Sequence, residues 1–322
     1  MRAKHCSLFL GLLVLLLGLA GCGNSAASGG PQLGAAARGP MIDKSGDASL
    51  QAMISEIVPK FAQGQFQAGD IIMNYNLFVP EKQEPGKKYP LVMFMADAST
   101  PGRDVKSPLL QGYGALVWAT LEAQKANPCY VLVPQFSGVA VNDAYERTPE
   151  VAASLQLLKK VVSENAVDPL RLYSTGQSMG GMISMLYDIA NPGIFAASMF
   201  VDCHWDTAQF DKLVETPFIF FYAGENGKAY KMKEPIENAA RKMDRGYTWS
   251  EWSARLPLAQ QDQLASTMLS KGQPINIIGF ENGTVLPENF QGSEHMYSFD
   301  HAYQIAPARE WLFKQSLKKS GL

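Results

Sequence analysis

The chain has 322 residues, of which 47% are hydrophobic and 18% are charged, and its formal net charge is −2. This composition is typical of a globular protein and is sufficient for a large buried core. The sequence contains no basic run of any length, so it gives no indication of a nucleic-acid partner.

The first residues have the pattern of an export signal. A positively charged start precedes an apolar run from Leu8 to Ala20, which is too short to span a membrane comfortably. Leu19-Ala20-Gly21-Cys22 matches the bacterial lipobox. The resemblance to lipoprotein signals implies removal of residues 1–21 and lipidation of Cys22. The protein is then expected in the bacterial cell envelope, with a lipid anchor as its only membrane contact. An ordinary secretory signal is the alternative.

A flexible tether is expected over residues 22–40, because this stretch is rich in Gly, Ala and Ser and almost free of charge. Residues 41–322 are expected to form a single domain, since no internal repeat or second domain is visible. Helical spacing of apolar residues predicts a helix over Ser49–Phe61, and alternation predicts an early antiparallel strand over Ile71–Val79.

From Leu91 onward, short apolar strands alternate with helices. The predicted strands are Leu91–Met95, Tyr130–Pro134, Arg171–Thr175, Ala196–Val201, Phe218–Tyr222 and Ile275–Phe280. The predicted helices are Leu109–Ala126, Pro149–Val162, Met182–Ala190, Glu234–Met243 and Pro307–Lys318. This rhythm favours an α/β fold with a mostly parallel, doubly wound sheet and helices on both faces. Residues 247–272 form a longer connection than the alternation of strands and helices requires. We interpret this segment as packing on the flank of the domain or as a small lid.

A five-residue motif lies between a predicted strand and a predicted helix. Gly176-Gln177-Ser178-Met179-Gly180 fits the pattern G-x-S-x-G, and strand, tight turn, serine and helix together are typical of a nucleophile elbow. Ser178 is expected at a strained φ/ψ, because a Cβ at Gly176 or Gly180 would collide with the crossing backbone. A glycine-rich turn of another α/β protein is the alternative interpretation.

A nucleophilic serine needs a base within hydrogen-bond reach, and histidines are few. Apart from His5 the chain has only His204, His295 and His301. In a protein with a nucleophile elbow the catalytic histidine follows the last strand of the sheet. His204 precedes that strand in the sequence and is therefore excluded.

Three stretches carry a family resemblance. GQSMGG, VDPLRLY and an ending of the form H-x-x-S-F-x-x-A-Y…EWLF resemble secreted α/β-hydrolases of the group with polyhydroxybutyrate depolymerases, feruloyl and acetyl esterases, and prolyl-oligopeptidase-like peptidases. The resemblance runs from Asn74 to the C-terminus and implies an α/β-hydrolase fold. It implies His295 as the base and places His301 at the start of the last helix.

The resemblance also implies an acid after the strand that ends at Tyr222. Glu225 is the only carboxylate there before Glu234, although similar proteins often carry aspartate a residue or two further on. Glu225 is therefore the expected acid, and it would hold the tautomer of His295.

The oxyanion hole is expected to use the N–H of Met179 and a second N–H from the loop after Leu91–Met95, from Ala98 or Asp97. A carboxylate that faced a developing oxyanion would repel it. We therefore expect the Asp97 side chain to point away and to cap the loop.

The substrate pocket is expected to include Gln177, His204 and Trp205. A short cluster of Cys203 and His204 with neighbouring aspartates is too small to indicate a metal site. Neither a metal nor a cofactor is expected.

The leading interpretation is a serine hydrolase that cleaves small-molecule or polymer esters of carboxylic acids through an acyl-enzyme, with Ser178, His295 and Glu225 as the catalytic residues. One alternative is a serine peptidase of the prolyl-oligopeptidase-like group, although no propeller repeat is visible. The other is a surface binding module whose catalysis has lapsed, which the unusual Ala96-Asp97 and the atypical acid suggest. Fold and triad do not define the ester.

Overall fold

The structure is a computed structural model that describes residues 39–225, 227–288, 290 and 292–318. The expected signal, most of the expected tether and the lipidation site Cys22 lie outside the described residues. No helix within the described ranges has both the length and the apolar character needed to cross a membrane.

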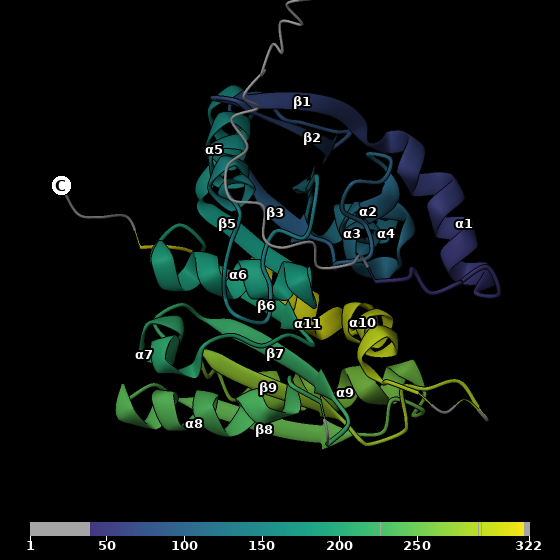
Figure 1. Ribbon diagram of the computed structural model, residues 1–322, viewed down its shortest axis with the longest axis vertical. Coiled ribbons are helices and arrows are strands. Elements are labelled where there is room, and N and C mark those ends of the chain that lie inside the picture. Colours follow the sequence, from purple (N-terminus) through teal and green to yellow (C-terminus); the bar gives the residue numbers. More distant parts are fainter. Residues whose placement is uncertain (1–38, 226, 289, 291, 319–322) are drawn as a thin grey trace, which may run out of the picture. The chain divides into compact units, whose positions relative to one another are not determined.

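The described residues form one sheet of nine strands, and Figure 1 shows them in succession from β1 at the top to β8 at the bottom. The spatial order is β1-β2-β4-β3-β5-β6-β7-β9-β8. β1 pairs with β2, and β2 with β4, in antiparallel fashion, and the other pairs are parallel. The strands are β1 (Ala62–Ala68), β2 (Ile71–Phe78), β3 (Tyr89–Met95), β4 (Tyr130–Gln135), β5 (Val167–Gln177), β6 (Ala197–Val201), β7 (Phe218–Ala223), β8 (Tyr247–Trp252) and β9 (Ile275–Phe280).

Helices pack on both faces of the sheet and enclose two hydrophobic cores. They are α1 (Ala48–Ile57), α2 (Ser107–Leu110), α3 (Tyr113–Leu116), α4 (Leu121–Ala126), α5 (Pro149–Glu164), α6 (Met179–Ala190), α7 (Phe210–Leu213), α8 (Lys233–Lys242), α9 (Leu258–Leu269), α10 (His295–Gln304) and α11 (Ala306–Phe313). Side chains of α1, α3, α9, α10 and α11 contribute to one core, and those of α5, α6, α7 and α8 to the other.

Strand β3 shows how the sheet separates the two cores. Val92 and Phe94 belong to the first core, whereas Leu91, Met93 and Met95 belong to the second. Successive side chains of a strand point to opposite faces, so a strand that is covered on both sides is apolar along its whole length. The predicted α/β class and the mostly parallel sheet are confirmed.

The predicted helix Leu109–Ala126 is wrong, because the structure contains three short helices there, α2, α3 and α4. The break lies at Gly112, where a Cβ would overlap the Asp300 carboxylate of α10. The same carboxylate accepts the N–H of Tyr113, 3.1 Å away, at the start of α3. Tertiary contact with α10 thus replaces a continuous helix with a bend.

Residues 247–272, for which the sequence allows either packing on the flank or a small lid, contain β8 and α9. β8 pairs in parallel with β9 at the edge of the sheet. Trp252 of this strand is buried and donates to Gln261 of α9, whereas Trp249 is 44% exposed. The segment therefore extends the sheet and packs on its flank.

Candidate active site

The turn between β5 and α6 holds Ser178 in an unusual backbone conformation, with φ 50° and ψ −119°. A Cβ at Gly180 would overlap the carbonyl oxygen of Met95 at the end of β3, and one at Gly176 would overlap the backbone of Gly180. The Ser178 N–H donates to the carbonyl oxygen of Val201 at 3.0 Å. Neighbouring strands on both sides thus hold the turn, which has the expected geometry of an elbow.

His295 is the histidine that meets this serine. It is the first residue of α10, and its Nε2 lies 2.8 Å from Ser178 Oγ, although the two are 117 positions apart in sequence. His301 lies six residues further along α10, and not at the start of the last helix as expected; its ring packs near Phe280 at 5.9 Å between ring centroids. His295, and not His301, is therefore the histidine within hydrogen-bond distance of Ser178.

The carboxylate that binds the other side of the His295 ring belongs to Asp202, with Oδ1 3.0 Å from Nδ1. Asp202 comes directly after β6, its side chain is 4% exposed, and its φ is 43°. The second carboxylate oxygen accepts the hydroxyl of Ser298, 2.7 Å away on the next turn of α10.

Glu225 does not occupy this position, so the expectation that it partners His295 is wrong. Glu225 follows β7 and is exposed to solvent. β6 lies between β5 and β7 in the sheet, and neighbouring strands are about 4.8 Å apart, so the end of β6 is one strand closer to Ser178. The signal for Asp202 was present in the sequence, since it is the carboxylate that directly follows a buried apolar strand.

The environment of His295 makes the imidazole more basic and selects one of its tautomers. Burial lowers the pKa of the imidazole, but the hydrogen bond and charge of Asp202, supported by the charge of Asp97, outweigh it and leave the pKa raised. The Asp202 carboxylate can only accept, so Nδ1 carries the proton. In the neutral ring Nε2 is then free to accept the Ser178 hydroxyl proton.

The two expected oxyanion donors belong to different elements, Met179 to α6 and Ala98 to the loop after β3. Met179 is the first residue of α6, where N–H groups have no intrahelical acceptor and the helix dipole favours negative charge. In the loop after β3, the Asp97 N–H donates to Gln111 Oε1 at 3.3 Å and the Ser99 N–H to Asp97 Oδ1 at 2.7 Å. In the sequence, Ala98 stands between these two residues, whose N–H groups are already hydrogen-bonded.

The side chain of Asp97 caps its own loop and also binds β5. It is 2% exposed, and its Oδ2 accepts the amide of Gln177 at 3.1 Å while Oδ1 caps Ser99. Gln177 is itself only 1% exposed and supports the loop. The prediction that it lines the pocket is therefore wrong.

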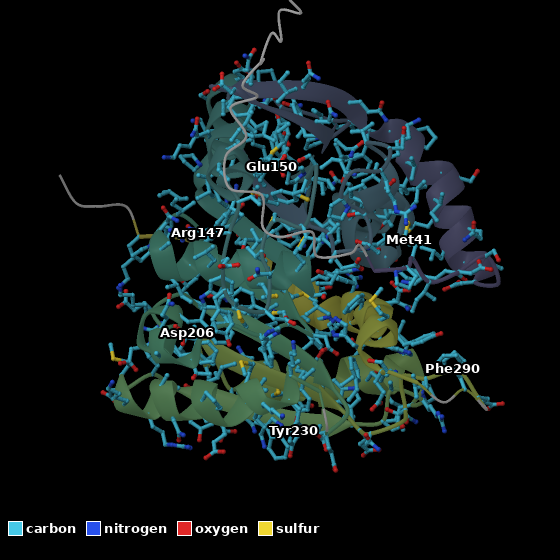
Figure 2. All side chains as sticks on the ribbon, viewed as in Figure 1. Met41, Arg147, Glu150, Asp206, Tyr230 and Phe290 are labelled. Atoms are coloured by element: carbon cyan, nitrogen blue, oxygen red, sulfur yellow. The ribbon has the colours of Figure 1, made fainter. Side chains whose placement is uncertain are left out.

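A cavity of about 770 Å³ opens above Ser178, Asp202 and His295. His204 lines it, as expected, whereas Trp205 does not, because it is 2% exposed and packs against Tyr145 at 5.3 Å between ring centroids. Apolar groups contribute one wall; they are Met182, Ala223, Ala229, Leu286 and Phe290. Phe290 is 44% exposed and lies on the loop that joins β9 to α10 (Figure 2).

Charged groups from separate loops meet at the same cavity. Asp143, in the loop between β4 and α5, binds Lys228 from the loop after β7 and lies 3.2 Å from His204 Nε2. Within the described ranges, no group of three His, Cys, Asp or Glu side chains is arranged to hold a metal ion.

Comparison with known proteins supports the fold. No protein-family model matches the sequence, and no curated protein matches it. Among solved structures, a thermostable esterase superposes with a TM-score of 0.66 at 23% identity over 81% of this chain. This chain spans 64% of the length of that esterase. A mutant of the feruloyl esterase module from Clostridium thermocellum, complexed with sinapinate, superposes with a TM-score of 0.52 at 13% identity over 81% of this chain and 90% of its own. The chain has an α/β-hydrolase fold.

Proposed function

We propose that this protein is a serine hydrolase that cleaves carboxylic esters through an acyl-enzyme intermediate. One observation carries the proposal. Ser178 Oγ, the His295 ring and the Asp202 carboxylate form a continuous chain of hydrogen bonds of 2.8 and 3.0 Å, and all three line one cavity. Nucleophile, base and orienting acid in this order are the requirement for acyl transfer from an ester.

The reaction follows from the positions of these groups. His295 Nε2 removes the proton of Ser178 Oγ as this oxygen attacks the ester carbonyl. The N–H groups of Met179 and Ala98 donate to the oxyanion, and Asp202 stabilises the imidazolium through Nδ1–H. Collapse of the tetrahedral intermediate breaks the bond to the alcohol, which leaves with the proton from His295. Water then attacks the acyl group with the same base, and the carboxylic acid is released from Ser178.

Replacement of the serine tests the proposal. Ser178→Ala is expected to lower kcat/KM for para-nitrophenyl acetate and butyrate by at least about 10³-fold, because no nucleophile remains. It is also expected to abolish labelling by a fluorophosphonate probe. The control Ser163→Ala removes an exposed hydroxyl on α5 and is expected to keep both. Retained turnover in Ser178→Ala would refute the proposal, and faster turnover of matched anilides than of esters would favour a peptidase.

We also propose that the protein is exported and anchored through a lipid on Cys22. The lipobox Leu19–Cys22 supports this. In cells fed a labelled fatty acid, the full chain is expected to take up label and to fractionate with membranes. Cys22→Ser is expected to lose both properties, and label that persists in this variant would contradict the proposal.

A further inference from the structure

Glu294 lies in the cavity directly before His295, and its carboxylate is held in place by two loops. Its Oε1 accepts the N–H of Gly283, in the loop after β9, at 2.6 Å. A Cβ at Gly224, in the loop after β7, would overlap Oε2. Gly224 leaves space for the carboxylate and the Gly283 N–H donates to it, so Glu294 is positioned and not merely a solvated surface group.

The charge of Glu294 has no counterpart in the described part of the chain. Asp143 is paired with Lys228, and Asp202 is hydrogen-bonded to His295. Among the side chains that the structure describes, Glu294 forms no ion pair. Burial raises the pKa of Glu294, the Gly283 N–H opposes this, and the nearby charge of Asp202 adds to it. A partly buried carboxylate without a cation is costly, and a cation that enters the cavity would relieve that cost.

An aromatic side chain lines the same cavity. Phe290 contributes its ring to the wall and packs against Tyr297 at 5.1 Å between ring centroids. The face of an aromatic ring attracts cations, quaternary ammonium groups in particular. Leu286 and Met182 supply apolar surface for the methyl groups of such a cation.

We propose that Glu294 binds a cationic group of the substrate, so that the preferred substrate is an ester with an ammonium group on its acyl or alcohol part. This inference rests on the proposed ester hydrolysis at Ser178. The ammonium would lie between the Glu294 carboxylate and the ring of Phe290, with the ester carbonyl at Ser178.

Two matched pairs of esters test the proposal. In the first, para-nitrophenyl trimethylammonio-butyrate is compared with its uncharged isostere, in which a quaternary carbon replaces nitrogen. In the second, acetylcholine is compared with dimethylbutyl acetate, its carbon isostere. One cation lies on the acyl side and the other on the alcohol side. In the pair whose cation reaches Glu294, kcat/KM is expected to be about tenfold higher for the cationic member, mainly through a lower KM.

Glu294→Gln keeps an acceptor for Gly283 and removes the charge, so the cationic preference is expected to disappear. The control Glu288→Gln makes the same change at an exposed site outside the cavity lining and is expected to keep the preference. A thermal melt of each variant confirms that it is folded. A preference that survives in Glu294→Gln would overturn the proposal.

The pH dependence of the wild-type preference gives a second readout that needs no variant. As the pH falls and Glu294 takes up a proton, the ratio of cationic to neutral kcat/KM is expected to fall. His295 and Asp202 act on both members of a pair alike and cancel in the ratio. His204, Asp143 and Lys228 also border the cavity. Any fall in the ratio that their titration causes is expected to persist in Glu294→Gln, so the variant separates it from the effect of Glu294.

The outcomes separate the two proposals. If the isosteres are hydrolysed and neither pair shows a cationic preference, the role of Glu294 is refuted and ester hydrolysis stands. If an anionic ester is preferred, Lys228 is the recognising group and the role of Glu294 is again refuted. If no ester is hydrolysed, both proposals fail.

Discussion

The carboxylate of Asp202 holds the imidazole of His295 at 3.0 Å, although 93 positions separate the two residues in the chain. The contact joins the end of β6 to the first turn of α10, and Ser298 on the next turn donates to the other carboxylate oxygen at 2.7 Å. Asp202 thus has one oxygen for the ring and one for the helix that carries the ring. This arrangement fixes both the tautomer and the position of the base.

Replacing Asp202 with Asn is expected to lower kcat/KM for simple esters by about 10²–10⁴-fold, because the amide can stabilise the wrong tautomer and cannot stabilise the imidazolium. The matched control is Glu225→Gln, which neutralises the exposed carboxylate after β7 and is expected to change kcat/KM by less than about twofold. Steady-state kinetics of the two variants decide between the two acids, and a larger loss in Glu225→Gln would contradict the structure.

The pH profile is expected to follow the raised pKa of His295. Only the neutral ring can accept the Ser178 proton, so kcat/KM falls as the pH drops through this pKa, which lies above its ordinary value of 6.5. In Asp202→Asn the burial of the ring is no longer outweighed, and the acidic limb is expected to move to lower pH. Rates measured from about pH 4 to pH 9 show the shift, and coincident limbs would argue against this coupling.

Gly180→Ala is expected to abolish activity and to destabilise the fold by about 3 kcal/mol or more, because its Cβ would overlap the carbonyl oxygen of Met95. Gly138 provides a control, since a Cβ there meets nothing within 4 Å. Gly138→Ala is expected to change stability by less than about 1 kcal/mol. Urea unfolding monitored by tryptophan fluorescence measures both, and equal stabilities would contradict the close packing at the elbow.

The core carboxyl of Asp188 is expected to make stability depend on pH. This residue of α6 is 1% exposed, and its Oδ2 has no hydrogen-bond partner among the described residues. Burial raises its pKa to about 8 despite an opposing hydrogen bond from Ser198. The unfolded chain ionises near 3.8, whereas the folded one keeps its proton until about 8. The contribution of this carboxyl to stability is therefore fully present below about pH 4 and is lost as the pH rises to 8, by up to about 1.4 kcal/mol per pH unit.

Asp188→Asn removes this titration, so its unfolding free energy is expected to decrease less than that of the wild type over the same range. Denaturant unfolding at several pH values measures the difference. Asp70→Asn, at an exposed position, is expected to retain the wild-type slope. Parallel curves for Asp188→Asn and the wild type would show that the carboxyl titrates normally.

The sequence pattern predicted the centre of the sheet better than its edges. Strand Ile275–Phe280 has the predicted bounds, because a strand covered on both faces is a continuous apolar run. β1 and β8 lie at the two edges, where one side of the strand has no neighbour and polar side chains are tolerated. Their sequences, AQGQFQA and YTWSEW, carry no such run, so neither was predicted.

The site residues that a short motif or a scarce residue type identifies could be predicted from the sequence. Ser178 is defined by five adjacent residues, and His295 by the small number of histidines and by the ending that surrounds it. Asp202 directly follows a buried apolar strand, but its contact with His295 depends on how α10 packs over the end of β6, which no local pattern encodes. The family resemblance implies an acid in the loop after β7, where Glu225 is the first carboxylate, and this is why it predicts the wrong residue.

Because the proposed acid directly follows β6, the loop after β7 has no part in the proposed proton transfer, yet Gly227, Lys228 and Ala229 line the cavity. Randomised libraries of this loop are therefore a direct route to variants with altered ester selectivity and an unchanged catalytic step. Protein engineers can exchange it for longer segments while the base and its carboxylate stay anchored on other elements.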